Sequence, residues 1–328
     1  MADKKSLISE FIPQKGDSPQ AVARKMVTIV ASAVLIVALA ILAVYFVKQA
    51  QNRKAIEDRR NAFANDITVI TPASTEPPEA EQEATETTAP PPLVMLDAFT
   101  DFMAQNPDTA GWIIVPNTDV NDVVVQTDNN DYYMDKDFNG NRNIAGQIFV
   151  DYRCVINDYD FNQTDNVIVY GHNQADSSMF GTLKKYKVKK DNTKNFSFYQ
   201  ENPTFTFTSL YGEYTYKIIA MFVIEVLPEQ TRDGVIFDYH NYVNFVGERN
   251  FEKFKENIMA RTGINTGVDF DENDKYMTLS TCSNEFDQSR FVVIGRRVRD
   301  GESPEVDTSL AEINTDMLEP DYSYIYSR

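Results

Sequence analysis

The sequence predicts a mainly β fold, a closed or nearly closed eight-stranded β-barrel with added helices. Short runs rich in β-branched and aromatic residues are separated by clusters of Asn, Asp and Gly, a pattern typical of strands joined by turns. One helical run interrupts the strands, and a long apolar segment precedes them. The predicted strands cover residues 112–115, 122–126, 147–152, 166–171, 204–210, 214–227, 276–282 and 290–298.

Composition narrows the class of protein. The chain has 328 residues and is 42% hydrophobic, which is enough for the core of one domain with extensions. Its net charge of −18 repels polyanions and argues against a nucleic-acid binder. Two cysteines, Cys154 and Cys282, and two histidines show no metal-ligand spacing. We therefore expect no metal and no cofactor, whereas a single Cys154–Cys282 disulfide stays open for an exported chain.

Residues 26–47 form an uncharged apolar run. At about 1.5 Å per residue the run is long enough to cross the roughly 30 Å core of a bilayer. A cleaved signal peptide is the rival interpretation, but its apolar region is usually only about 7 to 15 residues long. We expect a single-pass transmembrane signal-anchor helix, with residues 1–25 as a cytoplasmic tail and the rest outside the cell. Basic residues flank the run on both sides, so this orientation rests on the chemistry below rather than on charge.

The segment that follows divides into a spacer, a domain and a tail. Residues 48–92 are expected to form a polar helix and then a disordered stalk, because Pro, Glu and Thr dominate residues 71–92. The catalytic domain is predicted at residues 93–299. The acidic residues 300–328 are expected to form a loosely packed C-terminal tail, with a docked tail as the alternative.

Two helices are predicted within the domain. Apolar residues at helical spacing between Leu93 and Met103 indicate a helix before the first strand. Phe251, Phe254 and Ile258 share one helical face between the sixth and seventh strand runs. We expect this inserted helix to pack on the barrel and to shape one rim of a cleft.

Cys282 is the first candidate for catalysis. It ends a strand run, and Arg290 opens the next run after a short connection, so an antiparallel hairpin would place the two side by side. A thiolate can attack a carbonyl when a nearby cation or imidazole stabilises it. Arginine stays protonated, so Arg290 suits the stabilisation of an oxyanion rather than the role of a base.

A histidine must then act as the acid or base. His172 follows a strongly apolar strand and a glycine, which is a position at a barrel rim, whereas His240 lies among aromatic residues. His172 is therefore the better candidate, although either imidazole can have a structural role instead.

Four segments between residues 111 and 298 carry a resemblance to a known family. The sequence is similar to the class B sortases in the order, separation and flanking strands of these segments, and in the helix inserted before the cysteine strand. They are GWIIVPNTDVNDVVVQTDNNDYYM, NIAGQIFVDYR, NVIVYGHNQADSSMFGTLKKY and YMTLSTCSNEFDQSRFVVIGRRV.

The resemblance implies an eight-stranded sortase-type barrel and a role for each motif residue. Cys282 of LSTC would be the nucleophile, His172 of YGH the general acid and base, and Arg290 the group that holds the substrate carbonyl. The family cleaves a C-terminal sorting motif of secreted proteins through a thioacyl enzyme and passes them to an amine of cell-wall peptidoglycan. Ser280 and Thr281 are candidates for substrate contact, although strand packing explains them equally well.

The alternatives to a wall-anchoring sortase are a pilus-polymerising sortase and a catalytically silent, membrane-tethered binding module. A papain-like hydrolase fits poorly, because its cysteine would precede its histidine near a helix. Some class B members have an acidic residue two positions after the cysteine, but here Asn284 occupies it. We expect Glu285 and the basic residues 184–194 to lie in solvated loops, and Cys154 to be a small packing residue.

Overall fold

The structure, a computed structural model, describes residues 11–67, 92–160 and 162–327. The predicted stalk at residues 71–92 lies outside the described residues except at its last position. The chain divides into two compact units, Met1–Asp58 and Arg59–Arg328. Helix α2 (Pro19–Ile67) begins in the first unit and ends in the second.

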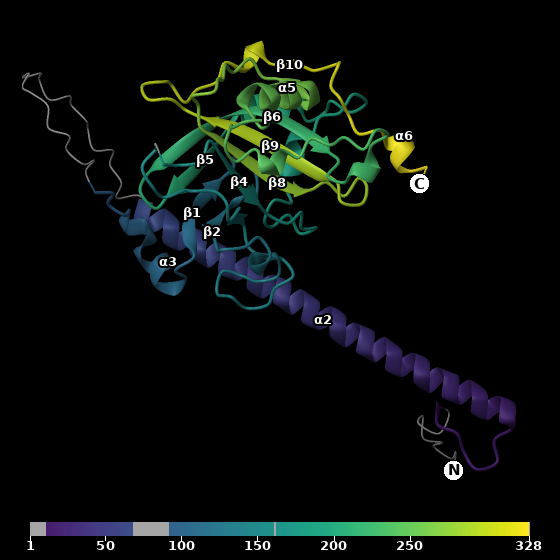
Figure 1. Cartoon of the computed structure of the whole chain (residues 1–328). Coiled ribbons are helices and arrows are strands. Elements are labelled where there is room, and N and C mark those ends of the chain that lie inside the picture. Colours follow the sequence, from purple (N-terminus) through teal and green to yellow (C-terminus); the bar gives the residue numbers. More distant parts are fainter. Residues whose placement is uncertain (1–10, 68–91, 161, 328) are drawn as a thin grey trace, which may run out of the picture. The chain divides into compact units, whose positions relative to one another are not determined.

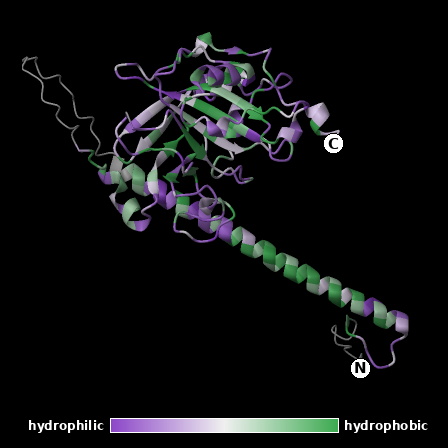
Figure 2. Ribbon diagram, viewed as in Figure 1, coloured by the Kyte–Doolittle hydropathy of each residue, from purple (hydrophilic) through white to green (hydrophobic). Residues whose placement is uncertain are grey.

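The first unit consists mainly of the apolar part of α2. The helix has an apolar window with a mean hydropathy of 3.0, none of which is buried. Figure 2 shows this window as a hydrophobic stretch, followed by a more polar end. By length and composition the helix can cross a membrane, as a signal sequence also can. The predicted apolar helix is thus present, and it continues through residues 48–65 as the sequence indicated.

The second unit is built on a closed barrel with the strand order β1-β2-β3-β4-β8-β9-β6-β5 (Figure 1). Each predicted strand run contributes one strand, which confirms the predicted barrel. Two further short strands, β7 (Ile264–Asn265) and β10 (Glu312–Ile313), pair with each other outside it. The barrel strands are β1 (Thr109–Ile114), β2 (Asn121–Val125), β3 (Phe149–Val150), β4 (Asn166–Tyr170), β5 (Thr204–Ser209), β6 (Glu213–Ile224), β8 (Tyr276–Cys282) and β9 (Arg290–Arg297).

The barrel is mixed. Strand β2 runs parallel to β3 and β4 runs parallel to β8, whereas the other neighbours are antiparallel. The parallel β4–β8 pair is joined by a long crossover that contains β5, β6 and the inserted helix α5 (Phe251–Arg261). Because parallel strands end at the same edge, this pair decides which loops meet at the carboxyl end of β8.

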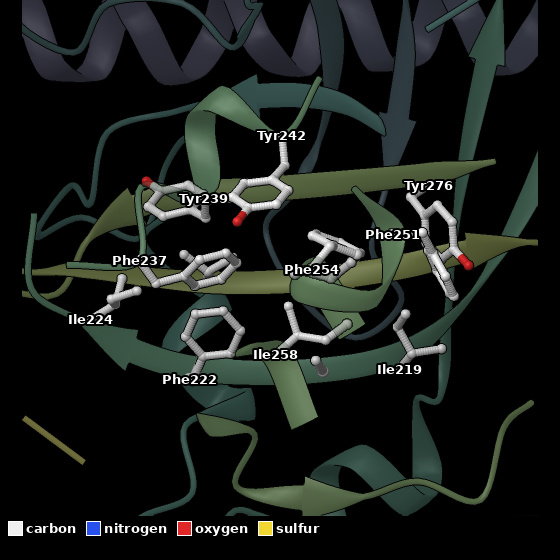
Figure 3. Close-up of a cluster of buried hydrophobic side chains, with 13 residues drawn as sticks. Ile219, Phe222, Ile224, Phe237, Tyr239, Tyr242, Phe251, Phe254, Ile258 and Tyr276 are labelled. Carbon is white, nitrogen blue, oxygen red and sulfur yellow. The ribbon is translucent and has the colours of Figure 1, made fainter. Parts of the chain in front are cut away.

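Helix α5 packs on the barrel as predicted. Phe251, Phe254 and Ile258 are buried against Tyr276 of β8 and Phe222 of β6 (Figure 3). The Asn250 side chain accepts a hydrogen bond from the Lys253 amide and so starts the helix. The aromatic segment before α5 is part of the same cluster, which buries Phe237, Tyr239 and Tyr242.

The end of α2 packs into a second cluster. Phe63 stacks on Trp112 with ring centroids 4.1 Å apart, and Phe102 packs against the same indole. Arg59 donates two hydrogen bonds to the buried carboxylate of Asp122, at 3.0 and 2.9 Å. The unit that holds the barrel therefore includes the last residues of α2, ahead of residue 93 where the sequence placed the start of the domain.

The helix predicted from Leu93 is shorter than expected. The Leu96 amide donates to the Leu210 carbonyl at 2.8 Å, which holds the chain extended before the helix. A 3-10 turn (Asp97–Phe99) and α3 (Thr100–Gln105) follow. The remaining α-helices are α4 (Phe196–Glu201) and α6 (Tyr322–Ile325), and the other 3-10 helices are Tyr132–Met134, Leu183–Tyr186, Pro228–Gln230, Tyr239–Asn241 and Thr308–Leu310.

The C-terminal segment is docked on the barrel, so the expectation of a loosely packed tail is wrong. Strand β10 pairs with β7, and the Leu318 amide donates to the Ala260 carbonyl at 2.6 Å. Near its start, Glu302 accepts hydrogen bonds from Lys217 at 2.6 Å and from the buried guanidinium of Arg296. Lys217 lies on β6, 85 residues earlier, and the sequence does not show that Arg296, six residues away, is buried; the sequence alone therefore suggested a solvated tail.

We predict that Glu302→Gln destabilises the protein by about 1–3 kcal/mol, because the buried Arg296 guanidinium is left with the longer 3.5 Å pairing with the exposed Asp269 as its counter-charge. Hydrogen bonds from Arg296 lower the pKa of Glu302. A lowered carboxyl pKa stabilises the fold above the unfolded pKa of about 4.3, and this stability is lost as the pH falls through the folded value. In urea unfolding, the difference between wild type and variant should therefore shrink as the pH falls below about 4. A difference that is the same at pH 7 and in acid would contradict this role.

Candidate active site

Cys282 and Arg290 lie side by side at one edge of the barrel. Cys282 is the last residue of β8 and Arg290 the first of β9, and they are direct partners in the antiparallel register. Every second residue of β8 points to the face that packs against the buried cluster around helix α5. These residues are Tyr276, Thr278, Ser280 and Cys282. The hairpin predicted from the short connection is confirmed, and the Cys282 thiol is free and partly exposed.

His172 is brought to the same edge by the parallel pairing of β4 with β8. Tyr170 is paired with Ser280, and the Gly171 amide donates to the Ser280 carbonyl at 3.2 Å. His172 therefore leaves β4 beside the end of β8. Directly after it, the Asn173 side chain donates to the Cys282 carbonyl at 2.8 Å. This hydrogen bond ties the histidine segment to the backbone of the cysteine.

Two glycines leave room around the His172 segment. At Gly146, which has a φ of +62°, an added Cβ would lie 2.6 Å from the Tyr133 carbonyl and 3.0 Å from the His172 ring. At Gly171, an added Cβ would lie 2.8 Å from the Phe180 ring. The His172 Nε2 atom lies 2.8 Å from the Met134 carbonyl. The ring is thus positioned by the loop before β3 as well as by β4.

The Arg290 side chain hydrogen-bonds its own loop. Its guanidinium donates to the Gln288 carbonyl at 3.0 Å, the Ser289 carbonyl at 3.3 Å and the Gln288 side chain at 3.3 Å. These bonds lie at or near the surface, where water can replace them at little cost. The structure brings the backbone of Arg290 to Cys282, while the guanidinium lies over residues 288–289.

Ser280 and Thr281 are both buried, with 2% and 4% exposure. The Ser280 hydroxyl is hydrogen-bonded to the Tyr239 hydroxyl at 2.6 Å. Among the residues that the structure describes, no partner is found for the Thr281 hydroxyl. Their contact with a substrate stays a prediction. Because both side chains are buried, such a contact would involve their backbone atoms more readily than their hydroxyls.

Tyr239 is a site residue that the sequence did not single out. Burial raises the pKa of its hydroxyl, whereas the hydrogen bond with Ser280 and the charge of Arg290 lower it. A thiolate on Cys282 would raise it again, so Tyr239 lies within electrostatic reach of both groups. Tyr239 lies in the sequence string FDYHN beside His240, but the sequence does not distinguish its aromatic residues from ordinary core residues.

The other two candidates, His240 and Cys154, contact Arg153 and strand β4 respectively. The His240 carbonyl accepts a hydrogen bond from Arg153 at 2.7 Å, and burial together with the Arg153 charge lowers the pKa of the His240 imidazole. Cys154 is buried, and burial raises the pKa of its thiol to about 12. Both cysteines are free, so the disulfide left open by the sequence is absent.

Comparison with known proteins assigns the chain to a family. A sortase domain model matches residues 113–298. The chain is 30% identical over 204 residues to sortase B of Listeria monocytogenes, covering 62% of this chain and 74% of that protein. It is 28% identical over 196 residues to sortase B of Staphylococcus aureus, covering 59% and 72%.

Solved structures share the fold. A Staphylococcus aureus sortase B–substrate complex has a TM-score of 0.58 at 24% identity and covers 76% of this chain and 98% of its own. Sortase B of Bacillus anthracis in complex with AAEK1 has a TM-score of 0.56 at 24% identity, covering 77% and 99%. The matched domain and barrel define a sortase-type transpeptidase, and this chain belongs to the sortase family. Its relatives and structural neighbours place the resemblance in class B.

We predict that Asn173→Asp lowers the free energy of unfolding by about 1–3 kcal/mol, because a carboxylate cannot donate to the Cys282 carbonyl. Asn162, exposed on a loop, provides the matched control, and Asn162→Asp should change stability by less than about 0.5 kcal/mol. Urea denaturation of both variants measures this. Equal midpoints for Asn173→Asp and wild type would show that the hydrogen bond does not hold the two segments together.

Proposed function

We propose that this protein cleaves a C-terminal sorting motif of secreted proteins through a thioacyl intermediate on Cys282 and transfers them to a peptidoglycan amine. The observation that carries the proposal is the convergence of β4, β8 and β9 at one barrel edge. Register places Cys282 opposite Arg290, and the parallel pairing of β4 with β8 ends at Tyr170 opposite Ser280, two residues before His172. The sortase relatives support the choice of substrate class.

In the first half of the reaction, the Cys282 thiolate attacks the carbonyl carbon of the scissile peptide bond. The S–C bond forms, the C–N bond breaks, and His172 in its imidazolium form gives its proton to the leaving amine. In the second half an acceptor amine attacks the thioester and gives a proton to His172. A new amide forms and the Cys282 thiolate is restored.

The surroundings of His172 support this role. A carbonyl oxygen can only accept a hydrogen bond, so the contact with Met134 keeps the proton on Nε2. Nδ1 is then the nitrogen that exchanges the catalytic proton. The hydrogen bond found for the ring is to a backbone carbonyl rather than to a carboxylate, consistent with Asn284 at the position where some class B members have an acid.

Arg290 supports the oxyanion in this proposal. Its guanidinium stays protonated and has several donors in a planar fork. A substrate carbonyl at Cys282 competes with the Gln288 and Ser289 carbonyls for those donors. Negative charge that develops on the substrate oxygen makes it the stronger acceptor, so the guanidinium binds the transition state more tightly than the ground state.

We further propose that the apolar part of α2 anchors the protein in the cell membrane as a single-pass helix, with the catalytic unit outside. The uncharged run at residues 26–47 and its exposure in the structure support an anchor. Peptidoglycan and exported proteins both occur outside the membrane, which favours this orientation.

The test is to incubate the full-length protein in detergent with a library of pentapeptides containing the Thr of sorting motifs, together with amine acceptors. We expect peptide cleavage, a mass adduct on Cys282 and an amide product with the amine. The absence of all three across the library would refute the proposed function.

Substitutions at the three site residues should then differ in a defined way. Cys282→Ala abolishes the adduct, and His172→Ala lowers kcat by about 10²–10⁴-fold. Arg290→Lys keeps the charge but loses the fork, and we expect a fall in kcat of about 10²–10³-fold.

Arg297→Lys provides the control for the last substitution, since Arg297 ends the same strand and pairs with Asp160. It should leave kcat within about twofold of wild type, because surface ion pairs contribute little and it is remote from Cys282. An Arg290→Lys enzyme with wild-type kcat would remove the guanidinium from the mechanism.

A further inference from the structure

The loop at residues 283–289 connects β8 to β9, between Cys282 and Arg290. Within it, the Ser289 side chain accepts hydrogen bonds from the Glu285 and Phe286 amides at 3.2 and 3.3 Å. Asn284 and Gln288 have φ values of 60° and 57°, in the left-handed region that non-glycine residues seldom adopt. A loop with two such residues and Arg290 at its end depends on outside contacts to keep one conformation.

Glu285 supplies the main outside contact. Its carboxylate pairs with Lys187 at 2.9 Å and with Lys189 at 2.5 Å, and its side chain is only 15% exposed. Burial alone would raise the pKa of Glu285, but hydrogen bonds from Lys189, Tyr322 and Lys187 outweigh it and lower the pKa. The expectation that Glu285 and the basic residues 184–194 lie in solvated loops is therefore wrong for these three charges.

The C-terminal segment closes this cluster from the other side. The Tyr322 hydroxyl donates to the Glu285 carboxylate at 2.6 Å, and its ring packs edge-on against Phe286. The Tyr326 hydroxyl donates to the Glu285 carbonyl. Lys189 lies 4.6 Å from the centre of the Tyr322 ring, so one lysine contacts both the loop and the tail.

The tail and the loop each have one further contact with the segment at residues 230–232. Asp321 pairs with Arg232 at 2.6 Å. Gln230, two residues before this arginine, donates to the Asp287 carbonyl of the loop at 2.6 Å. The sortase domain match ends at residue 298, so the tail residues that make these contacts lie outside the matched domain.

We propose that residues 319–326 form a brace that holds the loop at residues 283–289, and through it Arg290, in its catalytic position. Tyr322 of the brace and Glu285 of the loop are positioning residues and do not touch the substrate. The inference rests on the proposed function for its kinetic consequence, but the contacts of the brace exist independently of it.

The reason for a kinetic effect is geometric. Arg290 must reach the oxygen of a carbonyl bound at Cys282, and a displacement of about 1 Å at a catalytic group can cost about 10²-fold in rate. The brace is proposed to act on the position of the loop and Arg290 and not on substrate binding. Loss of the brace should therefore lower kcat with little change in KM, whereas a role in folding alone would lower thermal stability and leave kcat of the folded protein unchanged.

Three variants of the full-length protein test the brace. Tyr322→Phe removes one hydroxyl and keeps the ring, and Glu285→Gln removes the charge and keeps the size. A stop after Leu318 deletes α6 but keeps β10 and its pairing with β7. Tyr214→Phe provides the matched control, because Tyr214 lies on β6 at the end opposite Ile224, the residue paired with Arg290.

Two measurements decide the outcome. We expect a fall in kcat of about tenfold for each brace variant, with KM within about twofold of wild type. In hydrogen–deuterium exchange, the amides of residues 283–289 should exchange faster in the three variants than in wild type or Tyr214→Phe. Unchanged exchange in the deletion variant, or unchanged kcat despite faster exchange, would overturn the proposal.

A wild-type protein that forms no thioester would refute the proposed function and leave exchange as the criterion. Faster exchange of residues 283–289 in the deletion variant would then still support the brace on the loop, and protection equal to wild type would overturn it.

Discussion

The parallel pairing of β4 with β8 is the constraint on which the site depends. An antiparallel hairpin is enough to bring Cys282 and Arg290 together, because a short loop joins them. His172 has no such local connection, and its position along β8 follows from the five-residue register from Asn166 to Tyr170 and from the hydrogen bonds of Gly171 and Asn173 that continue it. A shift of this register by one residue would turn every side chain of the strand to the other face. The buried apolar residues of β4 therefore help to hold His172, the proposed acid and base, in place.

Strands and the cysteine–arginine hairpin could be predicted from the sequence, because their signals are local. Alternation and turn residues identified every barrel strand, and sequence distance alone placed Arg290 beside Cys282. The position of His172 required the resemblance to a family, since the crossover between β4 and β8 contains several other elements. Nothing in the residues of β4 says that its partner lies a hundred positions later.

What the sequence could not predict shares one physical cause: charged and polar side chains whose partners lie far along the chain. From the sequence, Glu285 is predicted to be a solvated loop residue. In the structure its carboxylate contacts Lys187, Lys189 and Tyr322. Glu302 belongs to an acidic segment in the sequence, but in the structure it accepts a hydrogen bond from Lys217 of β6, 85 residues earlier. In the same way, the sequence does not distinguish Tyr239 from a core aromatic residue, whereas the structure shows its hydroxyl hydrogen-bonded to Ser280. Apolar periodicity reveals which face is buried, but a charge carries no periodic signal that names its partner.

The site combines a rigid backbone with a side chain, that of Arg290, that can move to meet a carbonyl group. Cys282 and Arg290 end at a barrel edge where the backbone is fixed by strand pairing, while the Arg290 guanidinium is held only by surface hydrogen bonds. Rigid strands thus fix the thiol and the start of the arginine side chain, and the last few rotatable bonds of Arg290 remain free to meet a carbonyl. The loop contacts with Glu285 limit the motion of the backbone without occupying the guanidinium. In the proposed two-step transfer, such a division would let the same oxyanion donors serve the attack on the sorting peptide and the attack of the amine on the thioester.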